Sequence, residues 1–432
     1  MRLDIEQSKS LKVAATEQYH PVLVRRAEQL LEVTSESNYA QPESSINLPF
    51  DTNSSVATHR AVSAKVTDKL RYVFLVGIGG SNLGALAVHE ALRNRFSLHT
   101  YPQLISLDTT NAADMLALRQ LVGGQTDPEE YLVFIISKSG GTVETIANAE
   151  LLFSEVFNGQ VATDRIIVVS DEGSPLMNAA EKVSLERLVL PAVVGGRYSV
   201  FSPVGLAPLV ALGVDIVDLL HGARDIRPYC LNQDIWHNPA ALSAALLFVH
   251  YQYGHTVHDT FCFSPQLESV GKWYRQLLGE SIGKAVNIHD EPVHTGPIPT
   301  VSVGSTDLHS VGQLYLGGTP QILTTFVFDA MSPDTAGIPS ERVLTGLLPE
   351  LHGATADSIM SAIRYGTFAA YNEVERPFMS IELSGITPYE LGAFMQFKML
   401  EMMYLGTLFA VDPFDQPNVE LYKKHTRTKF AR

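Results

Sequence analysis

Two turns of this chain combine glycines with hydroxyl side chains directly after an apolar run. The first spans residues 77–84 (GIGGSNLG) and the second spans residues 137–144 (SKSGGTVE). Glycines let the backbone approach a ligand closely, and the N-terminus of a following helix offers free amide groups to an anion. Ser137, Ser139 and Thr142 add three hydroxyl donors to the second turn. This combination predicts a cage for a phosphate dianion.

Each turn also has a plainer interpretation. The spacing in residues 77–84 is not GxGxxG, and no acidic residue at a following strand end is placed to bind a ribose, which weighs against a dinucleotide site. A structural glycine turn, with Ser81 as a helix cap, stays open. Residues 137–144 lack the Lys-Ser/Thr ending of a nucleotide-binding loop. There the alternative is Thr142 as an ordinary helix N-cap.

Three further segments carry groups suited to proton transfer. Arg197 follows two glycines, which allow a tight backbone that can aim its guanidinium inward. Gln276 and Glu280 are four residues apart and share one face of a predicted helix, although a solvated pair of Glu280 with Lys284 is the alternative. His309 is one of 14 histidines and could transfer protons near neutral pH.

The tail at residues 413–424 (PFDQPNVELYKK) supplies another cation and an amide. It contains Gln416 and Lys423, and it opens a basic run whose usual meaning is a solvated terminus. Placed with the five segments upstream, these side chains indicate one site for rearranging a phosphorylated sugar.

Composition limits the class of protein. The chain has 432 residues, 45% of them hydrophobic, enough for two or three domains with buried cores. A formal charge of −15 argues against nucleic acid and anionic membranes as partners. The apolar stretch 391–410 carries Gln396, Lys398 and Glu401, which favours a buried helix over a membrane span. No His/Cys cluster suggests a metal. Two isolated cysteines and an N-terminus without signal-peptide character predict a cytoplasmic protein.

The hydrophobic periodicity alternates between strand and helix. The first half has predicted strands at 72–76, 131–136 and 166–169, between predicted helices at 82–96, 112–121 and 143–157. The second half has predicted strands at 257–263 and 321–328, with helices at 240–253, 271–278, 355–371 and 389–408. Such alternation is typical of parallel sheets covered by helices on both faces. The fold class is therefore α/β, with two sandwiches in series.

Six blocks, in order, resemble the glucose-6-phosphate isomerase (phosphoglucose isomerase) family of the bacterial type. They are residues 77–84, 137–144, 195–199, 276–284, 305–313 and 414–423, and the likeness runs from about residue 70 to the C-terminus. The resemblance implies two sugar-isomerase (SIS) domains, at 66–225 and 226–405. A helical N-terminal extension (1–65) and a C-terminal arm (406–432) flank them.

The resemblance also implies a role for each site residue. Glu280 matches the carboxylate that moves a proton between C1 and C2, and Arg197 the cation beside the enediolate. His309 and Lys423 match the pair implicated in ring opening. The remaining positions match substrate contacts: Gly80 and Ser81 at the sugar, Gln276 and Gln416 as polar contacts, and Ser137, Lys138, Ser139, Gly140, Gly141 and Thr142 at the phosphate. Relatives commonly have Thr at the place of Gly141 and Gly at the place of Asn418.

The implied reaction is the interconversion of D-glucose 6-phosphate and D-fructose 6-phosphate, without metal or organic cofactor. The implied assembly is a homodimer in which His309 reaches the partner's site. An isomerase that also accepts mannose 6-phosphate is an open alternative. A non-catalytic SIS sensor is disfavoured because the chain has two SIS domains and fills every proposed catalytic position. An aminosugar synthase would need an N-terminal nucleophilic cysteine, and none lies near Met1.

Overall fold

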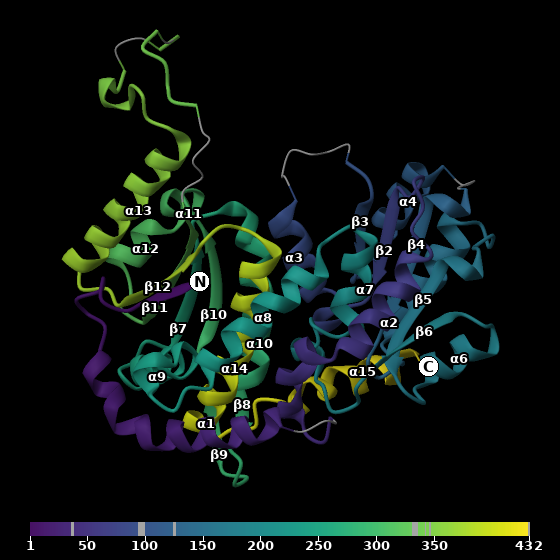
Figure 1. Cartoon of the computed structure of the whole chain (residues 1–432), viewed down its shortest axis with the longest axis horizontal. Coiled ribbons are helices and arrows are strands. Elements are labelled where there is room, and N and C mark those ends of the chain that lie inside the picture. Colours follow the sequence, from purple (N-terminus) through teal and green to yellow (C-terminus); the bar gives the residue numbers. More distant parts are fainter. Residues whose placement is uncertain are drawn as a thin grey trace.

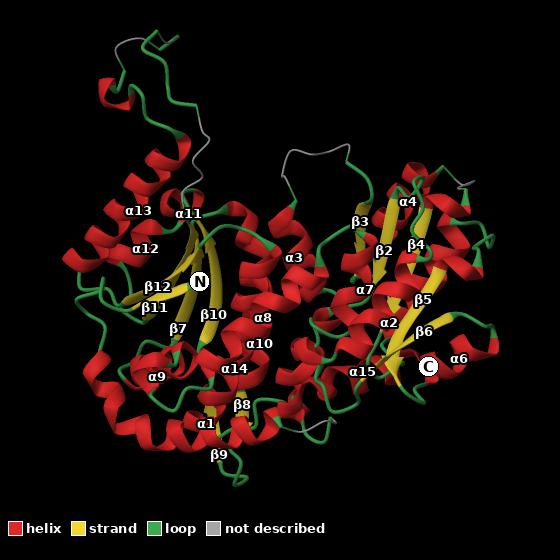
Figure 2. Cartoon of the chain, in the orientation of Figure 1, coloured by secondary structure: helices red, strands yellow, loops and turns green. Residues whose placement is uncertain are grey.

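Two α/β sandwiches lie side by side in the computed structural model of this chain (Figure 1). It describes residues 1–35, 39–93, 100–123, 127–330, 336–341, 343–344 and 347–430. Each sandwich is built on a sheet of five strands, and Figure 2 shows helices packed around both sheets. The α/β class predicted from the periodicity is confirmed.

The first sheet is entirely parallel, in the order β3-β2-β4-β5-β6. Its strands are β2 (Tyr72–Val76), β3 (Gln103–Leu107), β4 (Tyr131–Ile136), β5 (Ile166–Asp171) and β6 (Glu186–Leu190). All of β2 and β4 is buried, as expected for central parallel strands covered on both faces. Side chains alternate along β2, so Val73 and Leu75 face one core while Tyr72 and Phe74 face another.

The second sheet has the order β1-β12-β11-β7-β10, parallel except for β1. Its strands are β1 (Arg2–Asp4), β7 (Val257–Cys262), β10 (Ile298–Val303), β11 (Ile322–Asp329) and β12 (Phe378–Leu383). Residues 1–65, predicted as a helical extension, thus also contribute a strand, which pairs antiparallel with β12. Helices α1 (His20–Thr34) and α2 (Thr52–Ser63) follow in the same segment.

One hydrophobic core joins the facing sides of both sheets, through the helices between them. These helices are α3 (Leu83–Leu92), α7 (Pro203–Ala211), α8 (Ile216–Cys230), α9 (Pro239–Gln252), α10 (Glu268–Ile282) and α14 (Pro388–Phe409). Separate cores lie on the outer face of each sheet. The first is covered by α4 (Ala112–Val122), α5 (Val143–Leu151) and α6 (Pro175–Lys182), and the second by α11 (Thr306–Ser310), α12 (Gly312–Gly317) and α13 (Ala356–Glu373). The packed central layer fixes the two sandwiches relative to each other.

Local periodicity located most of the long helices but not α8, whose residues were predicted to join the two sandwiches, and it located the short strands poorly. Predicted strands 72–76 and 131–136 coincide with β2 and β4. The end of the helix predicted at 82–96 lies outside the described residues. Strands β1, β3, β6, β10 and β12 were not predicted, because strands of three to six residues next to turns carry little periodic signal.

The apolar stretch near the C-terminus is the buried helix α14. Lys398 and Glu401 form an ion pair of 2.8 Å in which both side chains are almost fully buried. Tyr274 of α10 donates a hydrogen bond of 2.7 Å to Glu401. In the described part of the chain, no helix combines the length and apolar character needed to cross a membrane.

Candidate active site

The two glycine-containing turns leave the same edge of the first sheet. Strands β2 and β4 are neighbours in parallel register, with Val76 opposite Ile135. The turns that follow them therefore start side by side. A Cβ atom on Gly77 would lie 2.9 Å from the carbonyl oxygen of Ile136. This edge, at the carboxyl ends of parallel strands, is where open α/β sheets bind ligands.

The hydroxyl groups of the second turn converge at the start of α5. The side-chain oxygens of Ser137 and Thr142 are 2.9 Å apart, and the Gly141 amide donates to Ser139 Oγ at 3.4 Å. Thr142 occupies the N-cap position, but its side chain makes no capping hydrogen bond. The hydroxyls and the free amides at the N-terminus of α5 therefore form one polar cradle suited to an anion.

The side chain of Lys138 binds groups outside this turn, so only its backbone is available to an anion there. The ammonium donates to the carbonyls of Ala192 and of Val194, the latter at 2.9 Å, and lies 3.6 Å from an oxygen of Asp171. The phosphate turn is thus tied to the segment that leads to Arg197.

The first turn packs against the segments that carry Arg197 and Gln276. A Cβ atom on Gly80 would lie 2.2 Å from the carbonyl carbon of Gly196, so only glycine allows this contact. Gly79 has a φ of +63°, and a Cβ atom there would lie 2.9 Å from Gln276 Nε2. Asn82, and not Ser81, occupies the N-cap position of the helix that follows, but its side chain makes no capping hydrogen bond, and Ser81 lies in a short 3₁₀ turn.

Arg197 is buried, and each of its five N–H groups donates a hydrogen bond. Nε donates to Ser281 Oγ at 2.9 Å. Nη1 donates to Glu280 Oε2 at 3.4 Å and to the side-chain oxygen of Gln416. Nη2 donates to the carbonyls of Pro413 at 2.6 Å and Asp415 at 3.0 Å. The planar guanidinium has five donors in a fixed geometry, so its position is set by α10 and by the C-terminal arm together.

Glu280 lies in the last turn of α10, with both carboxylate oxygens bound. Gln276 Nε2 donates to Oε1 at 3.2 Å, as the four-residue spacing predicted. Arg197 donates to Oε2, yet the Glu280 side chain remains 31% exposed. A carboxylate that is oriented on two sides and still accessible can act as a base toward a bound ligand.

Lys284 does not form the solvated pair with the Glu280 carboxylate that the sequence left open. Helix α10 ends at Ile282, and the Lys284 ammonium donates to the backbone carbonyl of Glu280 at 3.0 Å and to Asp415 Oδ1 at 2.7 Å.

The tail is brought to the site through Gln416 and not through Lys423. Lys423 lies on α15 (Glu420–Phe430), and its ammonium pairs with Glu420 at 2.7 Å. Within the described residues, no hydrogen bond or ion pair joins Lys423 to Glu280.

His309 lies at the far end of the second sheet. Gly279, next to Glu280, approaches Pro299 at the start of β10, whereas α11 with His309 follows the end of that strand. At about 3.3 Å per residue, this stretch of β10 separates the two regions by roughly 13 Å. Figure 1 shows α11 at the upper end of the sheet and β8 (Lys284–Val286), which follows Glu280, at the lower end. His309 is exposed, so one chain alone does not place it beside Glu280.

Sequence reasoning missed several polar partners of the site. Ser281 accepts from Arg197 and lies 3.0 Å from the hydroxyl of Tyr198, which donates to the Pro413 carbonyl. Asp415 binds both Arg197 and Lys284. The only signal in the sequence was that each of these residues adjoins a predicted site residue.

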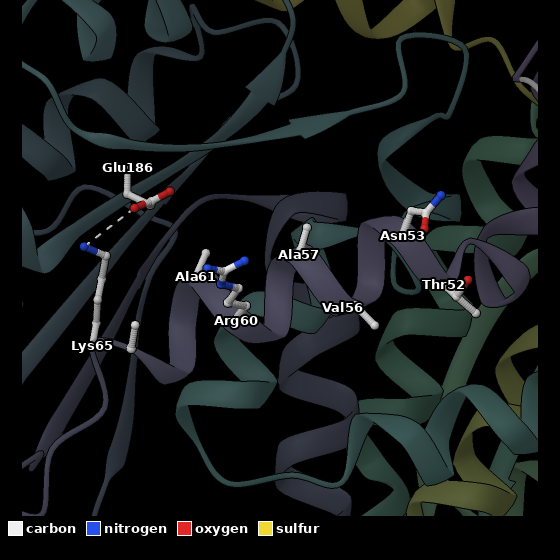
Figure 3. A pocket seen from close by; sticks show the side chains of 9 residues that line it. Thr52, Asn53, Val56, Ala57, Arg60, Ala61, Lys65 and Glu186 are labelled. Carbon is white, nitrogen blue, oxygen red and sulfur yellow. Dashed lines mark ion pairs between the residues drawn. The ribbon is translucent and has the colours of Figure 1, made fainter.

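A groove unconnected with these residues runs along α2 (Figure 3). Its polar lining includes Arg60 and an ion pair of 3.8 Å between Lys65 and Glu186. None of the predicted site residues lines it. The described residues also contain no group of three or more His, Cys, Asp or Glu placed to hold a metal ion.

The family model described as phosphoglucose isomerase matches residues 58–429. The chain belongs to the phosphoglucose isomerase family. Among curated relatives, a glucose-6-phosphate isomerase of Carboxydothermus hydrogenoformans is 32% identical over 89% of this chain and 84% of its own length. One from Methanocaldococcus jannaschii is 31% identical over 82% of each chain.

Solved structures share the fold of this phosphoglucose isomerase family member along almost its whole length. A hypothetical protein of Thermus thermophilus superposes with a TM-score of 0.88, at 29% identity and complete coverage of both chains. A glucose-6-phosphate isomerase of Chlamydia trachomatis has a TM-score of 0.78 at 20% identity, covering 95% of this chain and 78% of its own. The second likeness shows the fold alone.

Proposed function

We propose that this protein interconverts D-glucose 6-phosphate and D-fructose 6-phosphate, through ring opening and a cis-enediolate. The observation that carries the proposal is the half-buried Glu280 carboxylate, which is oriented by Arg197 and Gln276, two residues that pack against the turn at 77–84. Membership of the phosphoglucose isomerase family and the names of the relatives support it.

Moving a proton between adjacent carbons requires one base that reaches both. In a cis-enediolate, C1 and C2 can both be reached from the same face. Glu280 can therefore remove the proton from C2 and return it at C1. The intermediate carries negative charge on its oxygens. Arg197 is permanently charged and fixed in place, so it stabilises that charge without reorganising.

The phosphoryl group anchors the substrate at the cradle before α5. Ser137, Ser139 and Thr142 donate hydroxyl hydrogen bonds, and the amides around Lys138, Gly140 and Gly141 complete the site. Gly80 and Ser81 line the path from this cradle toward Glu280, and Gln276 and Gln416 contact the sugar hydroxyls.

Opening the sugar ring needs an acid for the ring oxygen and a base for the anomeric hydroxyl, the roles we assign to His309 and Lys423. The protein then works as a homodimer, with His309 of each subunit completing the partner's site. The exposure of His309 and its separation from Glu280 within one chain support this arrangement. Lys423 completes its site when the sugar is bound.

The substrates place the protein in glycolysis and gluconeogenesis, and we place it in the cytoplasm. Both cysteines, Cys230 and Cys262, are buried and unpaired, which supports a reducing compartment. The chemistry as derived uses side chains alone and calls for no cofactor.

The direct test is purified protein with fructose 6-phosphate, coupled to detection of glucose 6-phosphate, in the presence of a chelator. Turnover that saturates with substrate is expected. Absence of turnover with a folded, dimeric preparation would contradict the proposal. Mannose 6-phosphate as a second substrate measures how broad the activity is.

A further inference from the structure

The short stretch of residues 413–416 joins the C-terminal arm to Arg197. Backbone carbonyls of Pro413 and Asp415 accept from Arg197, and the Gln416 side chain accepts from the same guanidinium. These contacts bring together segments more than 200 residues apart in the sequence. Arg197 therefore binds one side of the stretch, together with the hydroxyl of Tyr198.

Lys284 binds the other side of residues 413–416. Its ammonium donates to the Asp415 backbone carbonyl, to Asp415 Oδ1 at 2.7 Å and to the Glu280 carbonyl at 3.0 Å. Three acceptors match the three N–H donors of an ammonium group. The Lys284 side chain is only 5% exposed, whereas that of Asp415 is 50% exposed. Burial lowers the pKa of Lys284, and Asp415 opposes that shift.

The Glu280 carbonyl is one of the last four of α10, which have no partner within the helix. A cation at that end satisfies the carbonyl and interacts favourably with the helix dipole. Lys284 thus binds the backbone of the residue proposed as the base and, at the same time, the arm that carries Gln416.

We propose that Lys284 and Asp415 form a positioning latch, which holds the C-terminal arm against the end of α10 and so fixes Glu280, Arg197 and Gln416 relative to one another. The inference rests on the proposed function. Neither residue touches the substrate, since both act through the three groups that they position. An unlatched arm leaves the phosphate cradle before α5 intact, because none of the latch contacts involves it.

The latch predicts a loss in turnover without a matching loss in binding. K284M keeps an apolar stem in the buried site and removes the ammonium, and D415N removes the charge from a half-exposed position. We expect each to lower kcat for fructose 6-phosphate about tenfold or more while KM stays within about threefold. K284R, which restores a cation, should regain part of the lost kcat.

The matched control is K272M, which changes a lysine on α10. Lys272 pairs with Glu268 at 2.7 Å, but the two side chains are 44% and 47% exposed. Its kcat should equal that of the wild type. Wild-type kcat in both K284M and D415N, or a change confined to KM, would overturn the latch. If K284M does not fold, D415N alone decides.

Amide hydrogen exchange provides a readout that does not depend on activity. Residues 413–419 should exchange at least about tenfold faster in K284M and D415N than in the wild type and K272M, while α5 should not change. Unchanged exchange in the arm would overturn the inference. If the wild-type protein converts no sugar phosphate, the proposed function is contradicted. The exchange experiment would still test the latch in that case.

Discussion

Glu280 shows how one carboxylate is prepared for two proton transfers. Its oxygens accept from Gln276 and Arg197, so its direction is fixed, and about a third of its side chain is left for a ligand. Arg197 in turn uses all five of its donors within the protein. Lysine could not replace it, because an ammonium offers three donors without the planar fork.

Replacing the base tests this picture at the scale of the residue. Glu280→Gln keeps the shape and the hydrogen bond from Arg197 but cannot accept a proton. We expect kcat to fall about 10²–10⁴-fold, with fructose 6-phosphate still binding in calorimetry. Glu268→Gln is the control, since Glu268 is an exposed carboxylate on the same helix. Near-normal turnover in Glu280→Gln would refute the assigned role.

At the scale of the element, two adjacent glycines of the phosphate turn differ in their surroundings. Gly140 has a φ of +65°, and a Cβ atom there would meet the Leu176 amide and Ser174 at 2.8 Å. Among the described residues, Gly141 has nothing within 4 Å of its Cβ position. The turn therefore requires glycine at the first position and tolerates a side chain at the second.

Substituting Gly140 and Gly141 one at a time tests which of the two positions requires glycine. Gly140→Ala should lower the free energy of unfolding by about 1–2 kcal/mol or more, because the left-handed backbone disfavours a Cβ atom. Gly141→Thr should leave stability within about 0.5 kcal/mol and lower KM for fructose 6-phosphate by adding a hydroxyl to the cradle. Chemical unfolding and steady-state kinetics measure both effects. Equal stability of the two variants would contradict the argument.

Strand β7, which lies between β11 and β10, carries a buried acid, Asp259. It accepts from Thr300 at 2.6 Å and from Ser302 at 3.0 Å, while its second oxygen has no hydrogen-bond partner in the described part of the chain. Burial raises the pKa of Asp259 to about 6, although these hydrogen bonds oppose the shift. In the unfolded chain the pKa of an aspartate is ~3.9. Between about pH 4 and about pH 6, the folded protein therefore holds a proton that the unfolded chain has already lost.

Because the pKa of Asp259 is higher in the folded protein than in the unfolded chain, this group lowers the free energy of unfolding as the pH rises. As pH rises from about 4 to about 6, this group should remove about 3 kcal/mol of stability, with little further change above. D259N stays neutral, so its stability relative to the wild type should increase across the same window. Urea unfolding at about pH 4.5 and about pH 7 measures it, with exposed Asp68→Asn as control. Parallel pH profiles for D259N and the wild type would contradict the assignment.

At the scale of the whole molecule, the candidate site draws residues from both sandwiches and from the C-terminal arm. The phosphate turn belongs to the first sheet, Glu280 to a helix of the central layer, and Gln416 to the arm. His309 lies on the outer side of the second sheet, after β10. A two-fold assembly in which each subunit lends His309 to the other would complete two identical sites.

Mixing inactive subunits tests that assembly. A dimer of one E280Q and one H309A subunit has one site with both defects and one intact site. Random reassociation should therefore restore about a quarter of wild-type activity from two inactive proteins, by the symmetry of the dimer. Light scattering confirms the dimer in each sample. No recovery in mixed dimers would show that His309 acts within its own chain or not at all.

The amino-acid sequence by itself determined the α/β class, the two central strands and the residue types of the site. These features depend on local periodicity and on short spacings, such as the four residues between Gln276 and Glu280. Only the tertiary structure decided that Lys284 binds Asp415, 131 residues away, that β1 joins the second sheet, and that His309 lies far from Glu280. Such contacts arise when distant segments pack around one core, and the spacing of residues along the chain does not encode which of them meet.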